Sequence, residues 1–105
     1  KIINLSKKKY FIDCSHLDLM SIIKVIKDSE FYIGNNSGPL NLSSALNVKT
    51  YGLIATDPVS ELKNSKIIPI LPDGYQDNIW TRDRKGMSKL KVDKVFDFIC
   101  KSEKL

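Results

Sequence analysis

A loop of glycine, asparagine and serine contains the residues of this sequence whose types and spacing best suit ligand binding. It has the sequence Gly-Asn-Asn-Ser-Gly-Pro over residues 34–39 and follows the short apolar run 30–33, which predicts a buried strand. Pro39 favours the first turn of a helix, where its missing N–H is not needed. The pattern therefore predicts a strand that ends in this loop, followed directly by a helix.

A helix that begins in such a loop is suited to binding an anion. Its first N–H groups have no partner within the helix, and the positive end of its dipole lies beside them. We therefore predict a phosphate or diphosphate at Ser37, Gly38 and Leu40. The surrounding substrate-binding residues would be Asn36, Pro39 and Asn41. The alternative is an ordinary turn in which Asn36 or Ser37 caps the helix.

A second loop of interest is formed by residues 55–58, Ala-Thr-Asp-Pro, which follow the apolar run 49–54. In a parallel sheet this loop would lie beside the first one, because ligands gather at the carboxyl ends of the strands. Thr56 could then donate a hydrogen bond to a phosphate or a ribose. The alternative is a simple turn at Asp57 and Pro58.

Composition limits the classes of partner. The 105 residues include 17 basic and 12 acidic side chains, and the net charge of +5 favours anionic ligands. The basic residues form no stripe interleaved with aromatic residues, so nucleic-acid binding is not expected. One histidine and two distant cysteines offer no metal-binding spacing, and we expect neither a metal site nor a cofactor. The cysteines, Cys14 and Cys100, are interpreted as small core residues in a reducing cytoplasm.

The hydrophobic pattern alternates between strands and helices. Asp18 is the predicted N-cap of a helix with apolar residues at spacings of three and four, and Val92 belongs to a closing amphipathic helix. Asn47 is the predicted stop of the helix that contains Pro39. Candidate strands occupy residues 2–5, 10–13, 30–33, 49–54 and 67–71, the last being an edge strand because of Pro69. This order predicts an α/β fold with a mostly parallel, Rossmann-like sheet, in one domain spanning residues 1–105.

Residues 31–58, FYIGNNSGPLNLSSALNVKTYGLIATDP, resemble the central motif of glycosyltransferase family 9, the ADP-heptose:lipopolysaccharide heptosyltransferases. Matching positions include Gly34, Asn35, the Ser37-Gly38-Pro39 run, Leu42, Ala45, Leu46, Val48, Thr50 and the Thr56-Asp57-Pro58 run. Weaker similarity extends over most of residues 10–100. This sequence has Asn36 in place of the family's aspartate and Asn41 in place of its histidine, and residues 54–56 form a shorter turn.

The resemblance implies a part of the C-terminal, Rossmann-like domain of a GT-B glycosyltransferase. In such enzymes the loop and helix hold the diphosphate of a nucleotide-sugar, which is transferred with inversion to a lipopolysaccharide acceptor without a metal. The resemblance thus implies an ADP-sugar as the favoured donor. It also implies a cytoplasmic location, with peripheral attachment to the inner membrane as an option.

Catalysis by this chain alone is not expected, and no catalytic residue is assigned. General base catalysis needs a group within hydrogen-bond reach of the acceptor hydroxyl. The resemblance places that group and the acceptor-binding domain in a segment upstream of this sequence. The alternative function is a non-catalytic α/β binding or interaction module. A partial sheet would expose an edge and an apolar face, so a homodimer through an edge strand or an apolar helix face is also expected.

Overall fold

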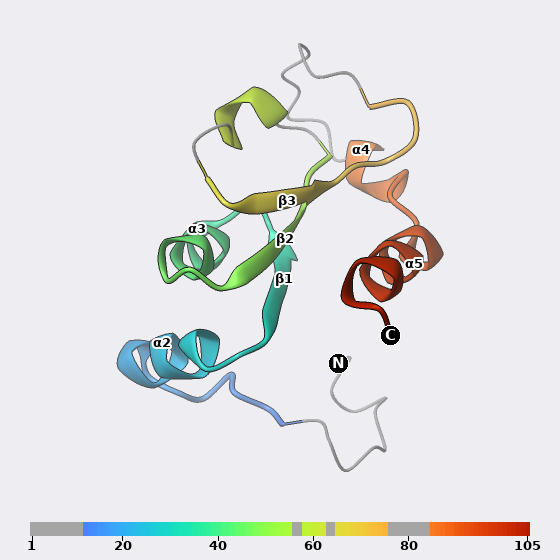
Figure 1. Ribbon diagram of the computed structural model, residues 1–105. Coiled ribbons are helices and arrows are strands. Elements are labelled where there is room, and N and C mark those ends of the chain that lie inside the picture. Colours follow the sequence, from blue (N-terminus) through green and yellow to red (C-terminus); the bar gives the residue numbers. More distant parts are fainter. Residues whose placement is uncertain (1–11, 56–57, 63–64, 76–84) are drawn as a thin grey trace.

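The computed structural model describes residues 12–55, 58–62, 65–75 and 85–105 (Figure 1). Within these residues the chain forms a parallel sheet with helices on both faces. The strands are β1 (Phe31–Asn35), β2 (Lys49–Leu53) and β3 (Ile67–Ile70). The helices are α2 (Leu19–Lys27), α3 (Gly38–Ala45), the 3₁₀ helix η1 (Val59–Leu62), α4 (Lys85–Ser88) and α5 (Val92–Glu103).

The three described strands are arranged in the order β1-β2-β3, and both neighbouring pairs are parallel. The register pairs Asn35 of β1 with Leu53 of β2, and Leu53 with Ile70 of β3. The carboxyl ends of the strands therefore meet at one end of the sheet. The prediction of an α/β fold with a parallel sheet is confirmed for the part of the chain that the structure describes.

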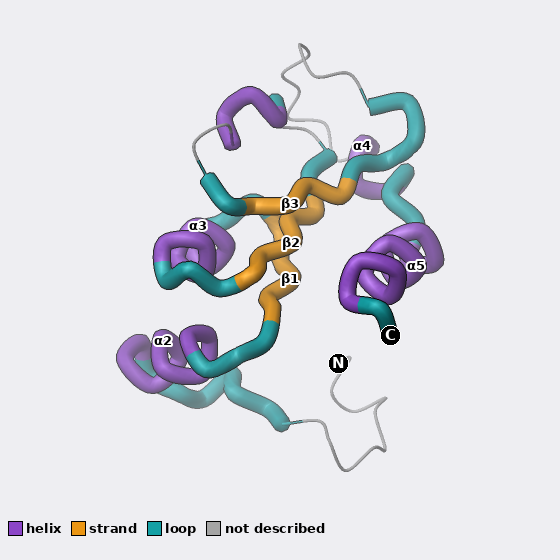
Figure 2. The backbone as a smooth tube through the Cα atoms, in the orientation of Figure 1, coloured by secondary structure: helices purple, strands orange, loops and turns teal. Residues whose placement is uncertain are grey.

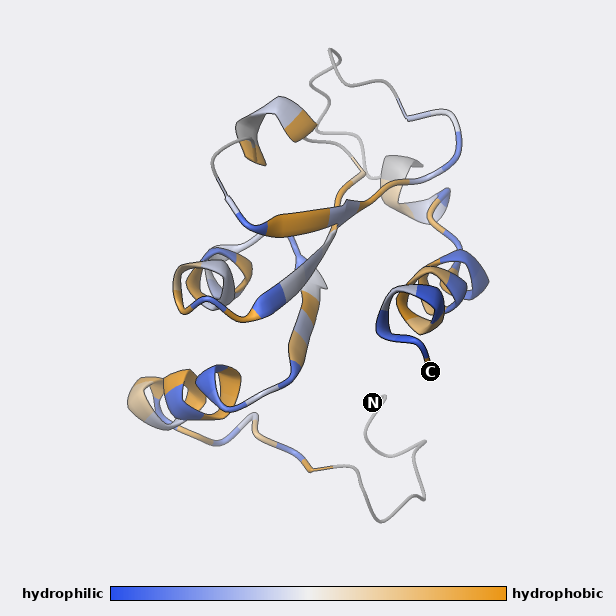
Figure 3. Cartoon of the chain, viewed as in Figure 1, coloured by the Kyte–Doolittle hydropathy of each residue, from blue (hydrophilic) through white to orange (hydrophobic). Residues whose placement is uncertain are grey.

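Helices cover the two faces of the sheet in different ways. Figures 1 and 2 show α3 against one face, with α2 beside it, and α5 against the opposite face. Leu40, Ile54 and Ile67 form the core on the α3 side. A second core, on the α5 side, consists of Tyr51, Ile70 and Ile99. Val95 and Ile99 of α5 pack against the sheet, whereas its apolar residues Val92 and Phe96 are exposed. Figure 3 shows apolar and charged residues distributed around this helix.

Local capping signals fix two of the helix ends. Asp18 is the N-cap of α2, and its carboxylate accepts a hydrogen bond of 2.8 Å from the Ser21 backbone N–H. This bond holds the pKa of Asp18 below its ordinary value. At the far end of α3, Asn47 adopts a left-handed φ of 66°, a conformation that asparagine tolerates well. Both signals are confirmed as the sequence predicted them.

The structure departs from the sequence predictions in several places. Ile12 and Asp13, the described half of the predicted strand 10–13, are irregular, because the Asp13 carboxylate accepts the Ser15 N–H in a local turn. The predicted strand 2–5 lies outside the described residues. The short helix α4 lies between the candidate strand 67–71 and the closing helix, where no element is predicted from the sequence. Cys14 and Cys100 are free thiols and only partly buried, so their assignment to the core is wrong.

Candidate functional site

The candidate site is the loop that joins the carboxyl end of β1 to the amino end of α3. The side chains of Asn35, Asn36, Ser37 and Pro39 are exposed, as is Gly38. Leu40 differs from them, because its side chain is completely buried against the sheet. Among the predicted ligand contacts, Leu40 can therefore contribute only its backbone N–H.

The backbone of Ser37 occupies the N-cap position, but its side chain does not cap the helix. The Ser37 hydroxyl instead donates to the Asn35 carbonyl at 3.2 Å. Asn41 donates twice to the Ser37 carbonyl, from its backbone N–H at 3.2 Å and from Nδ2 at 3.1 Å. The backbone N–H groups of Gly38 and Leu40, in the first turn of α3, therefore receive no side-chain cap from Ser37. Pro39, between them, has no N–H group.

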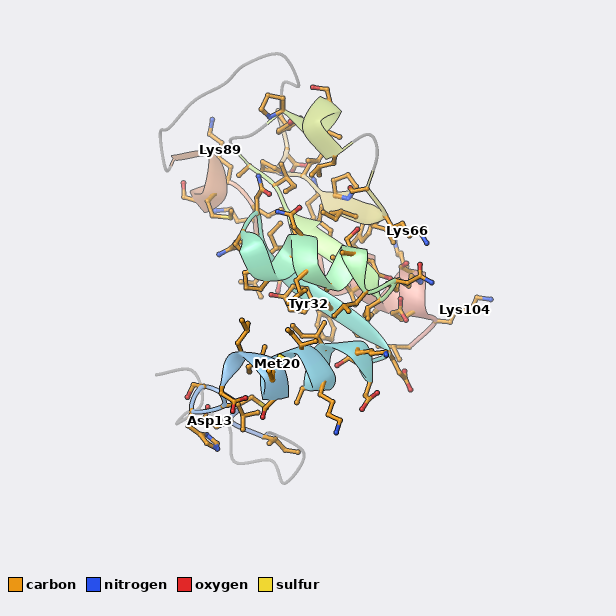
Figure 4. The ribbon with its side chains drawn as sticks, turned by 90° about the vertical axis from the view of Figure 1, so that its left-hand side faces the viewer. Asp13, Met20, Tyr32, Lys66, Lys89 and Lys104 are labelled. Carbon is orange, nitrogen blue, oxygen red and sulfur yellow. The ribbon has the colours of Figure 1, made fainter. Side chains whose placement is uncertain are left out.

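The two glycines of the loop have different surroundings. A Cβ added at Gly38 would meet no heavy atom of the described residues within 4 Å, so within this part of the chain the backbone faces open space. A Cβ at Gly34 would lie 2.7 Å from the ring of Tyr32, which Figure 4 places between α3 and α2. Gly38 therefore leaves room for a ligand to approach the backbone, whereas Gly34 makes room for an aromatic ring of the same chain.

Buried contacts hold α3 against the sheet and so determine where its amino end points. Ser43 and Thr50 are both completely buried, and their hydroxyls lie 2.8 Å apart. Ser43 Oγ also lies 2.9 Å from the Leu40 carbonyl, and Thr50 Oγ1 lies 2.7 Å from the Val48 carbonyl. Because each hydroxyl has one proton, one of them donates to its carbonyl and the other donates to its partner hydroxyl. Gly52 allows close packing here, because a Cβ on it would lie 3.1 Å from Leu40. The helix is thereby tied to β2 through its first two turns.

The loop after β2 begins beside the loop after β1, as the register of Asn35 with Leu53 requires. Thr56, the predicted second contact, lies outside the described residues. Beyond it, the backbone N–H of Val59 donates to the hydroxyl of Tyr75 at 2.9 Å. This bond joins the segment after β2 to the segment after β3 at the carboxyl end of the sheet.

The described part of the loop carries no charged side chain; its functional groups are amides, one hydroxyl and backbone N–H groups. Figure 4 shows Lys89 at the end of the molecule where α3 begins, and Lys66 and Lys104 at the opposite end. Among the described residues, no group of His, Cys, Asp and Glu side chains is arranged to hold a metal ion. Binding of an anion at this loop would therefore rest on backbone N–H groups and the helix dipole.

A polar hollow of about 400 Å³, which no sequence pattern indicates, lies at the carboxyl end of α3. It is lined by Asn41, Ser44, Ala45, Asn47, Ser65 and Lys66. The backbone N–H of Lys66 donates to Ser44 Oγ at 3.1 Å, and its ammonium group donates to Asn47 Oδ1. These bonds join segments that are 19 to 22 residues apart, so no local pattern could have indicated the hollow.

A hydrogen-bonded cluster fastens α5 to β2. The fully buried Tyr51 donates its hydroxyl proton to the Glu103 carboxylate, which also pairs with Lys49 at 2.7 Å. Ser102 Oγ lies 2.6 Å from the same Tyr51 hydroxyl. The hydrogen bonds from Lys49 and Tyr51 hold the pKa of Glu103 below its usual range. The same carboxylate, followed by Tyr51, raises the pKa of Lys49. The cluster lies at the amino end of β2, away from the candidate site.

Comparison with known proteins finds no match to this chain among family models, curated proteins or solved structures. None of the described helices is long and apolar enough to cross a membrane.

Proposed function

We propose that this chain binds the diphosphate of a nucleotide-sugar at the amino end of α3. In this proposal the chain is the donor-binding portion of a heptosyltransferase-like glycosyltransferase with a GT-B fold, and an ADP-sugar is the favoured donor. The acceptor would be of the lipopolysaccharide type and would bind to a separate domain.

One observation carries the proposal: no heavy atom of the described residues lies over the backbone at Gly38, the first residue of a helix that is anchored to the sheet. A diphosphate needs N–H donors that are fixed in position and accessible at close range. Exposed loop residues surround this position, and the buried Leu40 fixes the first turn from beneath. The resemblance of residues 31–58 to the heptosyltransferase motif supports the same location.

The neutral character of the described loop favours binding without chemistry. Asn36 and Asn41 can donate and accept hydrogen bonds, but neither can take up the proton of an acceptor hydroxyl at neutral pH. We therefore propose that this chain alone does not transfer a sugar. The same observation favours the second candidate function, a non-catalytic module that retains the fold but binds no nucleotide-sugar.

The test is a titration of the purified chain with ADP, UDP and an ADP-sugar, followed by amide NMR. We expect shifts centred on the N–H groups of Gly38, Leu40 and Asn41, with ADP more effective than UDP. The amides of Asn47 and Lys66 at the polar hollow serve as internal controls and should not move. A folded sample whose loop amides do not shift at millimolar ADP would contradict donor binding by this chain and favour the non-catalytic module.

A further inference from the structure

An apolar groove of about 490 Å³ lies between β1 and α5, on the opposite face of the sheet from α3. Phe31, Ile33 and Leu53 of the strands form one wall, and Val95 and Phe96 belong to the other. The nucleotide-binding proposal does not involve this groove. Because the lining of the groove is almost entirely apolar, apolar side chains of another element or chain could pack into it.

The side chains around the groove are unusually exposed for their type. Ile33 is 41% exposed, Phe96 66%, and Val92 and Leu105 82% each. With roughly 150–250 Å² per large side chain, these four expose on the order of 500 Å² of mainly apolar surface. This is comparable to the largest patch on a typical monomer, and it approaches the roughly 800 Å² that each partner buries in a standard interface.

The two edges of the described sheet differ in how they are protected. The β3 edge contains Pro69, which has no N–H to donate to another strand. The β1 edge, with the sequence Phe-Tyr-Ile-Gly-Asn, contains neither a proline nor a charged residue. Natural proteins block exposed edges with such residues, and an unblocked edge is a template for pairing with another chain.

We propose that two copies of this chain pair through β1 and close the groove between them. Antiparallel pairing about a two-fold axis through the middle of the strand places the Ile33 side chains of the two copies opposite each other. A two-fold axis perpendicular to the sheet keeps both α5 helices on the same face. Each copy then offers the protruding Phe96 and Val92 to the groove of the other.

Among the described residues, a strand edge without a proline or a charged residue, the groove and the protruding side chains occur together on this flank, which therefore suits a second copy. An interface of this kind uses the same patch on both partners, and paired β1 strands add area to the apolar patch. Each copy carries a net charge of +5, so the two repel one another at low ionic strength. Salt should therefore strengthen the dimer, whereas it would weaken attachment to an anionic surface.

The first test is sedimentation velocity of the full chain from micromolar to near-millimolar concentration. We expect a monomer–dimer equilibrium that shifts toward the dimer with added salt, and at least a tenfold weaker dimer in Phe96→Asp. Met20→Asp, which changes another exposed apolar residue on α2, is the matched control and should dimerise normally. A chain that stays monomeric throughout would overturn the proposal, and a lower melting temperature of Phe96→Asp would then indicate that the groove is covered within one chain.

The second test addresses the pairing itself, in a Cys14→Ser/Cys100→Ser background. Directly opposite residues of antiparallel strands have Cβ atoms about 4.5–5.5 Å apart, so Ile33→Cys should form a disulfide-linked dimer under mild oxidation. Met20→Cys should not. Efficient crosslinking of both variants, or of neither while a dimer sediments, would overturn the β1 pairing.

Discussion

Gly38→Ala is the sharpest perturbation of the proposed donor site, because it adds one methyl group at a position that the described side chains leave open. The new Cβ would meet no heavy atom of the described residues within 4 Å, and Gly38 does not have the left-handed φ that would strain an alanine. Alanine loses less backbone freedom on folding than glycine, so the variant should be as stable as the wild type or up to about 1 kcal/mol more stable. The methyl group would instead occupy the space through which a phosphate reaches the backbone. We expect the affinity for ADP to fall by at least about tenfold, or 1.4 kcal/mol.

Gly52→Ala is the contrasting variant, since it adds the same methyl group to β2, the strand against which α3 packs. There the Cβ would lie 2.9 Å from Ile67 Cγ2 and 3.1 Å from Leu40 Cδ2, inside the core. Overpacking of this kind costs about 1–3 kcal/mol. Urea unfolding and ADP titration of both variants separate stability from binding. The reasoning is refuted if Gly38→Ala binds ADP as the wild type does, or if it is destabilised as strongly as Gly52→Ala.

Two further predictions concern stability. The folded-state pKa values of Glu103 and Asp18 lie below their ordinary values of 4.5 and 3.8. Their stabilising contributions are therefore present above those values and are lost as the pH falls through the folded-state values. The pKa of Lys49 is raised above 10.5, so its contribution is complete below that pH and is lost as the pH rises through the folded-state value. Melting temperatures across pH should decline at both extremes, and Glu103→Gln should flatten both limbs; an unchanged profile in that variant would contradict the role of the cluster. For the buried hydroxyl pair, Ser43→Ala and Thr50→Val should each lower the free energy of unfolding by about 0.5–1.5 kcal/mol. The loss is modest because the hydroxyl that remains in each variant can still donate to a backbone carbonyl. The double variant should cost less than the sum of the two, and strict additivity in urea unfolding would show that the hydroxyls are not coupled.

The elements that the sequence predicts correctly are those governed by local chemistry. Asp18 caps α2 because its own side chain reaches the N–H three residues on, and Asn47 ends α3 because it tolerates a left-handed backbone. The parallel sheet follows from alternating apolar runs with a helix between β1 and β2. Asp13 is the counterexample, because its turn with Ser15 is equally local and overrides the strand expected from the apolar residues before it.

Features that depend on distant residues could not be predicted in this way. The position of Leu40 in the first helical turn predicts where its N–H lies, but it does not show that its side chain is buried in the core. The open space at Gly38 and the crowded space at Gly34 are indistinguishable in sequence, since both are glycines of one loop. The attachment of Tyr51 to Glu103 spans 52 residues, and hydrophobic periodicity contains no information about it.

The chemistry of the loop determines which substitutions can be informative. Ser37 was the side chain that the sequence favoured as a phosphate donor, but its hydroxyl already donates to the Asn35 carbonyl. Asn41 likewise gives its backbone N–H and one of its two Nδ2 protons to the Ser37 carbonyl. The Ser37 hydroxyl could donate to a phosphate only by leaving the Asn35 carbonyl, so these two side chains could add one Nδ2 proton of Asn41 to the N–H groups of the backbone. Recognition of a diphosphate at this loop would therefore rest mainly on backbone N–H groups, which no side-chain deletion removes and which Gly38→Ala would cover.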